Sequence, residues 1–262
     1  SFRYKENVGP YFLFPSSFTV NHAMGRENIN DHLVKMGRVQ NKNDLEKYHI
    51  KQKFFEKTYK EYADLVRLVA IKFKDTKIIV RPHPSEDHAE WNKLAKGYSN
   101  IKIINDGDIA SWIIGAELVV HSSCTTGMES FIIGKPVISF LPYTDHEYVK
   151  QISNKVSKVC SSKSEVIQNI KFFQTNQYFE NYNRSELTSY LSKHINNINN
   201  TFSYELISNH LKKIQQLKDK RKLPLLKFHI TKLKRILRSF KSILLNPKGY
   251  NYSIQKFPGL KK

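Results

Sequence analysis

The chain has 262 residues, which is enough for one large or two small domains with a buried core. Hydrophobic residues make up 40% and charged residues 25%, as in globular proteins, and no apolar run is long enough to cross a membrane. The two cysteines are too few for a disulfide framework, which favours a reducing cytoplasm.

The formal net charge of +20 is unevenly distributed along the chain. Residues 200–262 contain sixteen Lys and Arg but only two acidic residues, so most of the excess lies in the last quarter. The first residues, SFRYKENVG, do not form a signal peptide, lack an initiator Met and lead directly into a predicted strand. We therefore expect the chain to be the C-terminal part of a longer protein.

Strands and helices are predicted to alternate through the first domain, residues 1–175. A strand at 11–14 is followed by a polar loop at 16–22, and residues 28–51 are expected to be helical in two pieces. A longer helix is predicted at 52–73. Its apolar face carries Phe55, Tyr59, Tyr62, Leu65, Val66 and Val69 at intervals of three and four residues.

The same alternation continues along the chain. Further strands are predicted at 77–80, 101–104, 118–120, 136–141 and 156–160. Helices are expected after the first three of these strands and after the last, at 87–96, 109–115, 126–133 and 164–173. This order predicts an α/β fold with a doubly wound parallel sheet, whose ligand-binding loops open on one edge.

The second predicted domain, residues 176–262, is a basic helical extension. Between Leu226 and Leu245, apolar residues recur every three or four positions among Lys and Arg. This pattern predicts an amphipathic helix that docks on an anionic membrane surface. The alternative is a helix that packs across a partner domain.

The turn after the strand at 118–120 reads HSSCTTG and is predicted to open a helix. The hydroxyls of Ser122, Ser123, Thr125 and Thr126 lie where unpaired N–H groups and the helix dipole favour an anion. Gly127 leaves room for a phosphate to approach. We interpret the turn as a phosphate site, and the alternative is ordinary capping, because Ser and Thr are common N-cap residues.

The loop after the strand at 77–80 reads RPHP. Pro82 and Pro84 restrict the backbone on both sides of His83, so the imidazole is expected to point in one fixed direction. Arg81 is either a phosphate partner or a solvated cation at the strand end.

In this order, RPHP and HSS resemble the HP and Ser-Ser/Thr motifs of bacterial sialyltransferases, polysialyltransferases and β-Kdo transferases. With Phe14-Pro15-Ser16 and SSCTTGMES followed by GKP, they look like the surface carbohydrate biosynthesis proteins, a family regarded as glycosyltransferases. The resemblance covers residues 11–160. It implies a Rossmann-like domain, the C-terminal, donor-binding half of a GT-B glycosyltransferase.

The resemblance also implies a nucleotide-sugar partner, a CMP-nonulosonate or CMP-Kdo-like donor, used in capsule or lipopolysaccharide synthesis. By analogy, His83 stabilises the phosphate leaving group, while Pro84, Ser122 and Ser123 contact the nucleotide. Hydroxyls, helix N–H groups and an imidazolium suit this transfer, because negative charge grows on the departing phosphate. We expect a glycan or glycolipid acceptor, a cytoplasmic enzyme that is peripheral on the inner membrane, and no cofactor.

Several polar residues have two readings. Glu129 is expected either to accept from the ribose hydroxyls or to form a capping box with Thr126. His121 is either a ligand or a packed histidine. Five loop residues are further candidates at the same edge: His22, Asp106, Asp108, Tyr143 and His146.

Two chemical features are not assigned. Asn105-Asp106-Gly107 superficially matches the motif that carries the base of sialyltransferases, but it begins with Asn and follows the HP motif. No catalytic base is therefore assigned. No His, Cys and Asp cluster has the spacing of zinc ligands, so no metal is expected.

Two other functions are weighed against this interpretation. A CDP-glycerol-type polyol phosphotransferase would use a similar RxHP segment and differ in the group attached to phosphate. A non-catalytic, basic membrane- or nucleic-acid-binding protein would explain the positive charge. The charge is concentrated in one amphipathic segment, and no RRM, KH or helix-turn-helix signature occurs, so no nucleic-acid partner is expected.

Overall fold

The computed structural model describes residues 9–18, 26–145, 147–149, 151–175, 184–195 and 203–220. The chain forms two compact units, Ser1–Ile198 and Asn199–Lys262. The second unit contains helix α10, Ser203–Lys220, which exposes Ile207 and Leu211. The predicted helix from Leu226 to Leu245 lies outside the described residues. In the described part of the chain, every helix is too short or too polar to span a bilayer.

Six strands of the first unit form one sheet in the order β3-β2-β1-β4-β5-β6. They are β1 Tyr11–Pro15, β2 Lys77–Arg81, β3 Ile101–Ile103, β4 Leu118–His121, β5 Val137–Phe140 and β6 Lys158–Cys160. All neighbouring strands pair in parallel. This is the strand order of a Rossmann-like fold. Successive strands are added on one side of β1 up to β3 and on the other side from β4 onward, so the order reverses between β1 and β4. The predicted fold class is confirmed.

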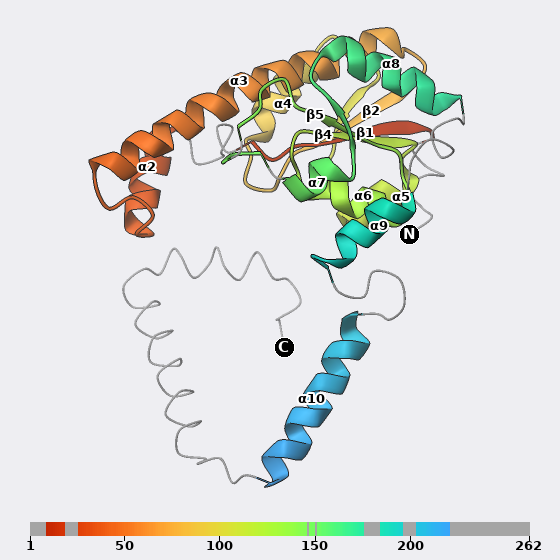
Figure 1. Ribbon diagram of the computed structural model, residues 1–262. Helices are drawn as coiled ribbons and strands as arrows, with labels where there is room; N and C mark the ends of the chain where they lie inside the picture. Colours follow the sequence, from red (N-terminus) through yellow and green to blue (C-terminus); the bar gives the residue numbers. More distant parts are fainter. Residues whose placement is uncertain are drawn as a thin grey trace, which may run out of the picture. The chain divides into compact units, whose positions relative to one another are not determined.

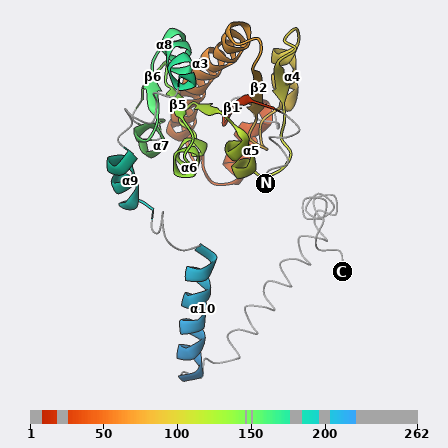
Figure 2. The same cartoon turned by 90° about the vertical axis from the view of Figure 1, so that its right-hand side faces the viewer.

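Helices cover both faces of the sheet (Figures 1 and 2). In the first unit they are α2 Arg26–Lys35, α3 Lys42–Lys72, α4 His88–Ala95, α5 Ile109–Gly115, α6 Thr126–Ile133, α7 Gln151–Lys155, α8 Lys163–Gln174 and α9 Arg184–Ser192. Helices α3, α4 and α8 share one core with Phe12 and Phe14. Helix α5 packs on the opposite face through Trp112, against Tyr11 and Leu13. The alternation of side chains along β1 therefore supplies both cores.

Helix α9 belongs to the first unit. Its Leu191 is fully buried and packs with Phe131 of α6 and Val137 of β5. The compact α/β unit thus continues past the domain boundary that the sequence suggested at residue 175.

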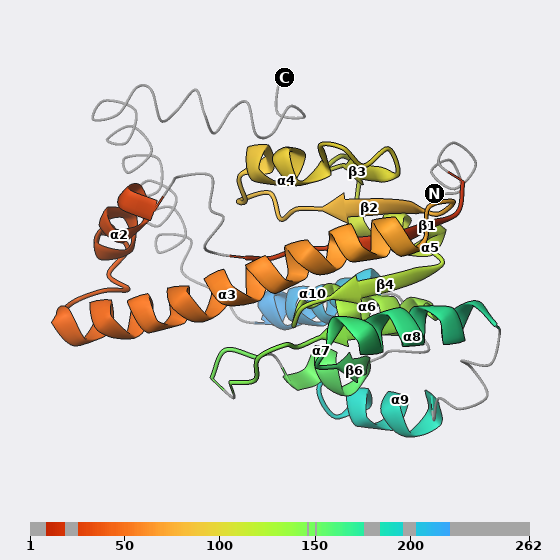
Figure 3. The ribbon, with the colours of Figure 1, turned by 90° about the horizontal axis from the view of Figure 1, so that it is seen from above.

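Helix α3 is longer than predicted, because the second helical piece expected in 28–51 joins the helix expected at 52–73. No Gly or Pro interrupts residues 42–72. The helix begins after Asn41, whose side-chain oxygen accepts from the N–H of Asp44 at 3.0 Å. Figure 3 shows the N-terminal part of α3 extending beyond the sheet, near α2. The short helix α7 was not predicted.

The C-terminal end of α6 follows the prediction. Gly134 adopts a left-handed conformation, with φ 91°. Its N–H bonds the carbonyl of Phe131 at 3.0 Å, and the N–H of Lys135 bonds that of Ser130 at 2.9 Å. These two bonds form a Schellman motif and turn the chain into β5.

Tyr62 of α3 bridges the two strands at the point where the sheet order reverses. Its hydroxyl lies 3.0 Å from the carbonyl oxygen of Pro15 on β1 and 2.7 Å from that of Val120 on β4. The side chain is fully buried, and burial raises the pKa of Tyr62 well above its ordinary value. One buried hydroxyl therefore serves two carbonyls on adjacent strands.

We expect Tyr62→Phe to lower the free energy of unfolding by about 1–3 kcal/mol, because two buried carbonyls lose their shared donor. Urea unfolding measures the change. Tyr59→Phe is the matched control, since the half-buried Tyr59 hydroxyl makes no hydrogen bond recorded in the described part of the chain. Equal losses in the two variants would contradict a specific role for the Tyr62 hydroxyl.

Candidate functional site

A cavity of about 390 Å³ opens at the carboxyl ends of β1, β2 and β4. It lies at the reversal of strand order, where ligands bind in open α/β sheets. Its lining comes from the loops that follow β1 to β4, from α5 and from α6. The lining residues are Pro15, Ser16, Ser17, Arg81, Pro82, His83, Pro84, Asn105, Ile109, Cys124, Thr125, Thr126 and Glu129.

The cavity brings together part of the predicted site. Six of the predicted residues line it: Arg81, His83, Pro84, Thr125, Thr126 and Glu129. Ser122, Ser123 and Gly127 do not belong to its lining. The two motifs thus meet through the RPHP loop and the first turn of α6, and the serine pair lies beside the cavity.

Ser123 has an unusual backbone and a partner on α7. Its φ of 53° makes it the one residue other than glycine with positive φ in the described part of the chain. The amide nitrogen of Asn154 donates to its hydroxyl at 3.2 Å, and the amide oxygen accepts from Ser139 at 2.7 Å. Such backbone strain costs about 1–3 kcal/mol and persists where neighbours enforce it.

The predicted capping box of Thr126 and Glu129 is wrong. The N-cap of α6 is Thr125, which has helical dihedral angles and makes no side-chain cap bond. Thr126 is buried inside the helix, with its hydroxyl 3.4 Å from the thiol of Cys124. The N–H of Cys124 instead donates to Nδ1 of His121 at 3.1 Å.

This geometry leaves two backbone donors at the cavity. The N–H groups of Gly127, Met128 and Glu129 bond carbonyls of the preceding turn. No acceptor is recorded in the described part of the chain for the N–H groups of Thr125 and Thr126. Both residues line the cavity at the positive end of α6, so an anion there would find unpaired donors.

His121 is a packed histidine. It is fully buried, and burial lowers its pKa to about 3, so the ring is neutral. Nδ1 accepts from Cys124, which places the proton on Nε2, 2.9 Å from the hydroxyl of Ser157. That hydroxyl donates to the carbonyl of Ser153 at 2.6 Å. The imidazole therefore supports the turn from below and does not reach the cavity.

Gly127 accommodates this ring, which corrects its predicted role. A Cβ atom at Gly127 would collide with the His121 imidazole. We expected the missing side chain to leave room for a phosphate. The structure shows that the room is taken by a buried histidine.

Arg81 is half-buried, and two of its donors are used in hydrogen bonds within the protein. Its guanidinium donates to the carbonyl of Asp106 at 2.6 Å and to that of Gly107 at 2.5 Å. These bonds hold the loop after β3 against the end of β2. Asp108 caps α5 by accepting from the N–H and hydroxyl of Ser111, at 2.8 and 2.6 Å, which lowers the pKa of its carboxyl. Both aspartates thus have structural roles in the turn.

His83 is exposed at the cavity and has a defined orientation. The N–H of Ser85 donates to its Nδ1 at 3.2 Å, and the hydroxyl of Ser85 lies 2.7 Å from the same atom. Because Nδ1 faces a backbone donor, the neutral ring carries its proton on Nε2. In this tautomer His83 is arranged to offer the N–H at Nε2 to a ligand.

The sequence reasoning missed Glu86, which holds the site together. Glu86 is only 3% exposed. Its Oε1 accepts from the hydroxyl of Ser16 at 2.9 Å and from the N–H groups of Phe18 and His83, both at 3.2 Å. Its Oε2 accepts from the indole N–H of Trp91 at 2.9 Å. One carboxylate thus fastens the loops after β1 and β2 to α4.

The remaining candidates are less informative. Glu129 is half-buried in the cavity lining, and with the capping box absent its proposed ribose contact stays a prediction. Tyr143 packs under the ammonium of Lys57, which lies 4.1 Å from its ring centroid. His22 and His146 lie outside the described residues. Among the described residues, no group of His, Cys, Asp and Glu could hold a metal ion.

Comparison with known proteins gives remote structural likeness. No protein-family model matches the chain. No curated protein matches it either. Escherichia coli heptosyltransferase WaaC with ADP is 16% identical at a TM-score of 0.39, over 64% of this chain and 45% of WaaC. Methanocaldococcus jannaschii UDP-GlcNAc 2-epimerase, in complex with UDP-GlcNAc and UDP, is also 16% identical, with a TM-score of 0.39. The match covers 65% of this chain and 40% of the epimerase. The chain thus spans less than half of either protein.

The buried carboxyl of Glu86 predicts a pH effect on stability. Burial raises its pKa in the folded state, although the four hydrogen bonds oppose the shift. The contribution of Glu86 is therefore complete below the unfolded-state pKa and declines as the pH rises through the folded-state pKa. We expect the difference in unfolding free energy between the native protein and Glu86→Gln to fall from pH 4 to pH 7, measured by urea unfolding.

Glu165→Gln is the control with the opposite sign. The N–H of Ser161 lowers the pKa of Glu165, so its contribution is present above the unfolded-state pKa and is lost as the pH falls. Its difference from the native protein should rise with pH. A Glu86→Gln difference that stays constant or rises with pH would contradict the burial argument.

The contact between Gly127 and His121 is testable by a double-mutant cycle. Gly127→Ala should lower the free energy of unfolding by about 1–3 kcal/mol, because the added methyl overpacks the ring. The same substitution in a His121→Ala background should cost much less, since the ring is gone. Equal costs in both backgrounds, measured by urea unfolding, would mean that the glycine is needed for another reason.

Proposed function

We propose that this chain is the donor-binding half of a GT-B glycosyltransferase and that its cavity binds a CMP-linked sugar. The donor is a CMP-nonulosonate or CMP-Kdo-like compound, and the product is a bacterial surface polysaccharide. One observation carries the proposal. His83 of the RPHP loop and the first turn of α6, which follows the HSS motif, line one cavity at the reversal of the sheet.

The chemistry of the cavity supports a nucleoside phosphate. A volume of about 390 Å³ falls in the range of small-molecule sites. The N–H groups of Thr125 and Thr126 and the exposed hydroxyl of Thr125 would hold the phosphate at the positive end of α6. The carboxylate of Glu129, in the same first turn of α6, would accept from the ribose hydroxyls.

The same donors would assist the transfer step. When the bond between the anomeric carbon and the phosphate oxygen breaks, negative charge grows on that oxygen. Donors fixed by the protein bind this charge more tightly in the transition state than in the ground state. His83 would contribute the N–H at Nε2, with its ring directed by Ser85. The acceptor is a glycan or glycolipid, and we assign no residue to the catalytic base.

We expect calorimetric titration to show binding of CMP that is tighter than that of UMP or ADP. Thr125→Val should weaken CMP binding about tenfold or more, because a hydrogen bond to a charged phosphate contributes about 1.5–3 kcal/mol. Thr175→Val, an exposed threonine at the end of α8, is the matched control and should not change it. Tighter binding of UMP or ADP than of CMP would refute the donor assignment.

Two substitutions of His83 separate its two nitrogens. The amide nitrogen of Gln can take the place of Nε2, whereas the amide of Asn reaches only the position of Nδ1. We expect His83→Gln to keep much of the CMP affinity and His83→Asn to lose about tenfold. Equal affinity of both variants and the native protein in calorimetry would exclude a phosphate contact through Nε2.

Association with an anionic membrane remains a proposal based on the basic residues from Leu226 to Leu245. Such an association would bring the enzyme to lipid-linked acceptors at the inner membrane. Helix α10 adds exposed apolar residues, Ile207 and Leu211, beside Lys212 and Lys213.

A further inference from the structure

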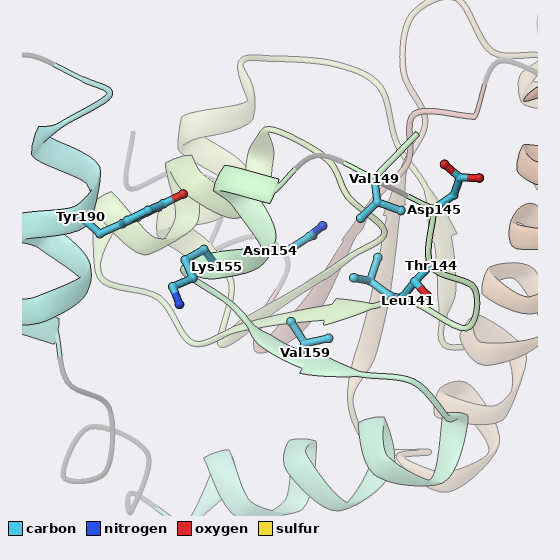
Figure 4. A pocket seen from close by; sticks show the side chains of 8 residues that line it. All are labelled: Leu141, Thr144, Asp145, Val149, Asn154, Lys155, Val159 and Tyr190. Carbon is cyan, nitrogen blue, oxygen red and sulfur yellow. The ribbon is translucent and has the colours of Figure 1, made fainter. Parts of the chain in front are cut away.

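A second cavity, of about 400 Å³, opens at the carboxyl end of β5 (Figure 4). Its walls come from the loop after β5, from α7, from β6 and from α9. The lining residues are Leu141, Thr144, Asp145, Val149, Asn154, Lys155, Val159 and Tyr190. None of them lines the first cavity, at the carboxyl ends of β1, β2 and β4, which is called the nucleotide cavity below. The two cavities therefore have separate walls.

One part of this cavity is an apolar wall. Figure 4 shows Leu141, Val149 and Val159 gathered together. Val159 belongs to the edge strand β6 and is 48% exposed, so this part of the wall is open to a ligand. Tyr190 adds an aromatic ring with a hydroxyl from α9. A surface of this kind suits a ligand that has an apolar face and hydroxyls at its edge.

The cavity also has one available positive charge. Lys155 is exposed and makes no ion pair among the residues that the structure describes. The carboxylate of Asp145 accepts from the N–H of Glu147 at 2.9 Å, and Figure 4 shows it directed away from the aliphatic wall. The ammonium of Lys155 is thus available to an anionic group of a ligand.

This cavity is physically connected to the turn at the nucleotide site. Asn154 lines it, and the same side chain bonds Ser123, the residue with the left-handed backbone. Ser123 directly precedes Cys124 and Thr125, which line the nucleotide cavity. The turn after β4 therefore lies between two cavities on one edge of the sheet. A nucleotide in one cavity and a saccharide in the other would be on opposite sides of this turn.

We propose that the second cavity binds an acidic saccharide unit, a sugar ring that carries a carboxylate. This inference rests on the proposed glycosyltransferase function. The C–H face of the ring lies on Leu141, Val149 and Val159, and the ammonium of Lys155 binds the carboxylate. The hydroxyl of Tyr190 bonds a ring hydroxyl. The unit belongs to either the donor sugar or the acceptor glycan, which share this chemistry.

The test is binding of D-glucuronate and D-glucose by saturation-transfer NMR and calorimetry. We expect saturable binding of glucuronate, and weaker binding of glucose, which lacks the carboxylate. Lys155→Met should weaken glucuronate binding about tenfold, as expected for a lost charged hydrogen bond. Lys158→Met is the matched control, because Lys158 is exposed on β6 outside the lining. Failure of glucuronate to bind, or equal binding by Lys155→Met, would overturn the inference.

Two further arms identify the source of the saccharide. If the cavity holds the donor sugar, CMP-N-acetylneuraminate should displace glucuronate from the native protein, whereas CMP should not. If it holds the acceptor, glucuronate should stay bound in the presence of either nucleotide. CMP binding is measured on the same samples. Lys155→Met should keep it, so a failure of the nucleotide site is seen separately from a failure of the saccharide site.

Discussion

The carboxylate of Glu86 is the contact on which the candidate site depends. It accepts four hydrogen bonds, from Ser16, Phe18, His83 and Trp91. These donors come from two loops and one helix, so a single carboxylate joins all three. A buried carboxylate is costly unless its oxygens are satisfied, so the loops must close around it. Its bond to the N–H of His83 fixes the backbone from which the ring projects, and Ser85 orients the ring itself.

The turn after β4 is held by a second set of buried polar contacts. His121 is neutral and caps the turn through Cys124, while Gly127 leaves space for the ring. On the far side, Asn154 holds Ser123. The residues that suggested ligand binding in the sequence therefore divide into two kinds. Thr125 and Thr126 face the cavity, and their neighbours hold the turn in place.

The fold could be predicted from the sequence because its signals are local. Short β-branched runs alternate with helical periodicity, and glycine and proline mark their ends, as Gly134 shows. The join between the two parts of α3 was missed because a polar surface helix and a separate helical piece have the same local pattern. The short α7 was missed because five residues give too little periodicity.

The site could be predicted only in outline. The two motifs were placed at one edge of the sheet, since loops after parallel strands converge there. The role of Glu86 was not foreseen, because the burial of a loop carboxylate depends on its partners. Ser16 lies 70 residues earlier in the sequence, and Trp91 belongs to helix α4. The same holds for Gly127, whose neighbour is known only once His121 turns inward. Tertiary contacts of this kind leave no local signature.

The most direct test of the account is a crystal structure of the protein with CMP. The account predicts the phosphate within hydrogen-bonding distance of the N–H groups of Thr125 and Thr126 and of Nε2 of His83, with the ribose near Glu129. A nucleotide bound at another place, or a phosphate that contacts neither His83 nor the first turn of α6, would contradict it.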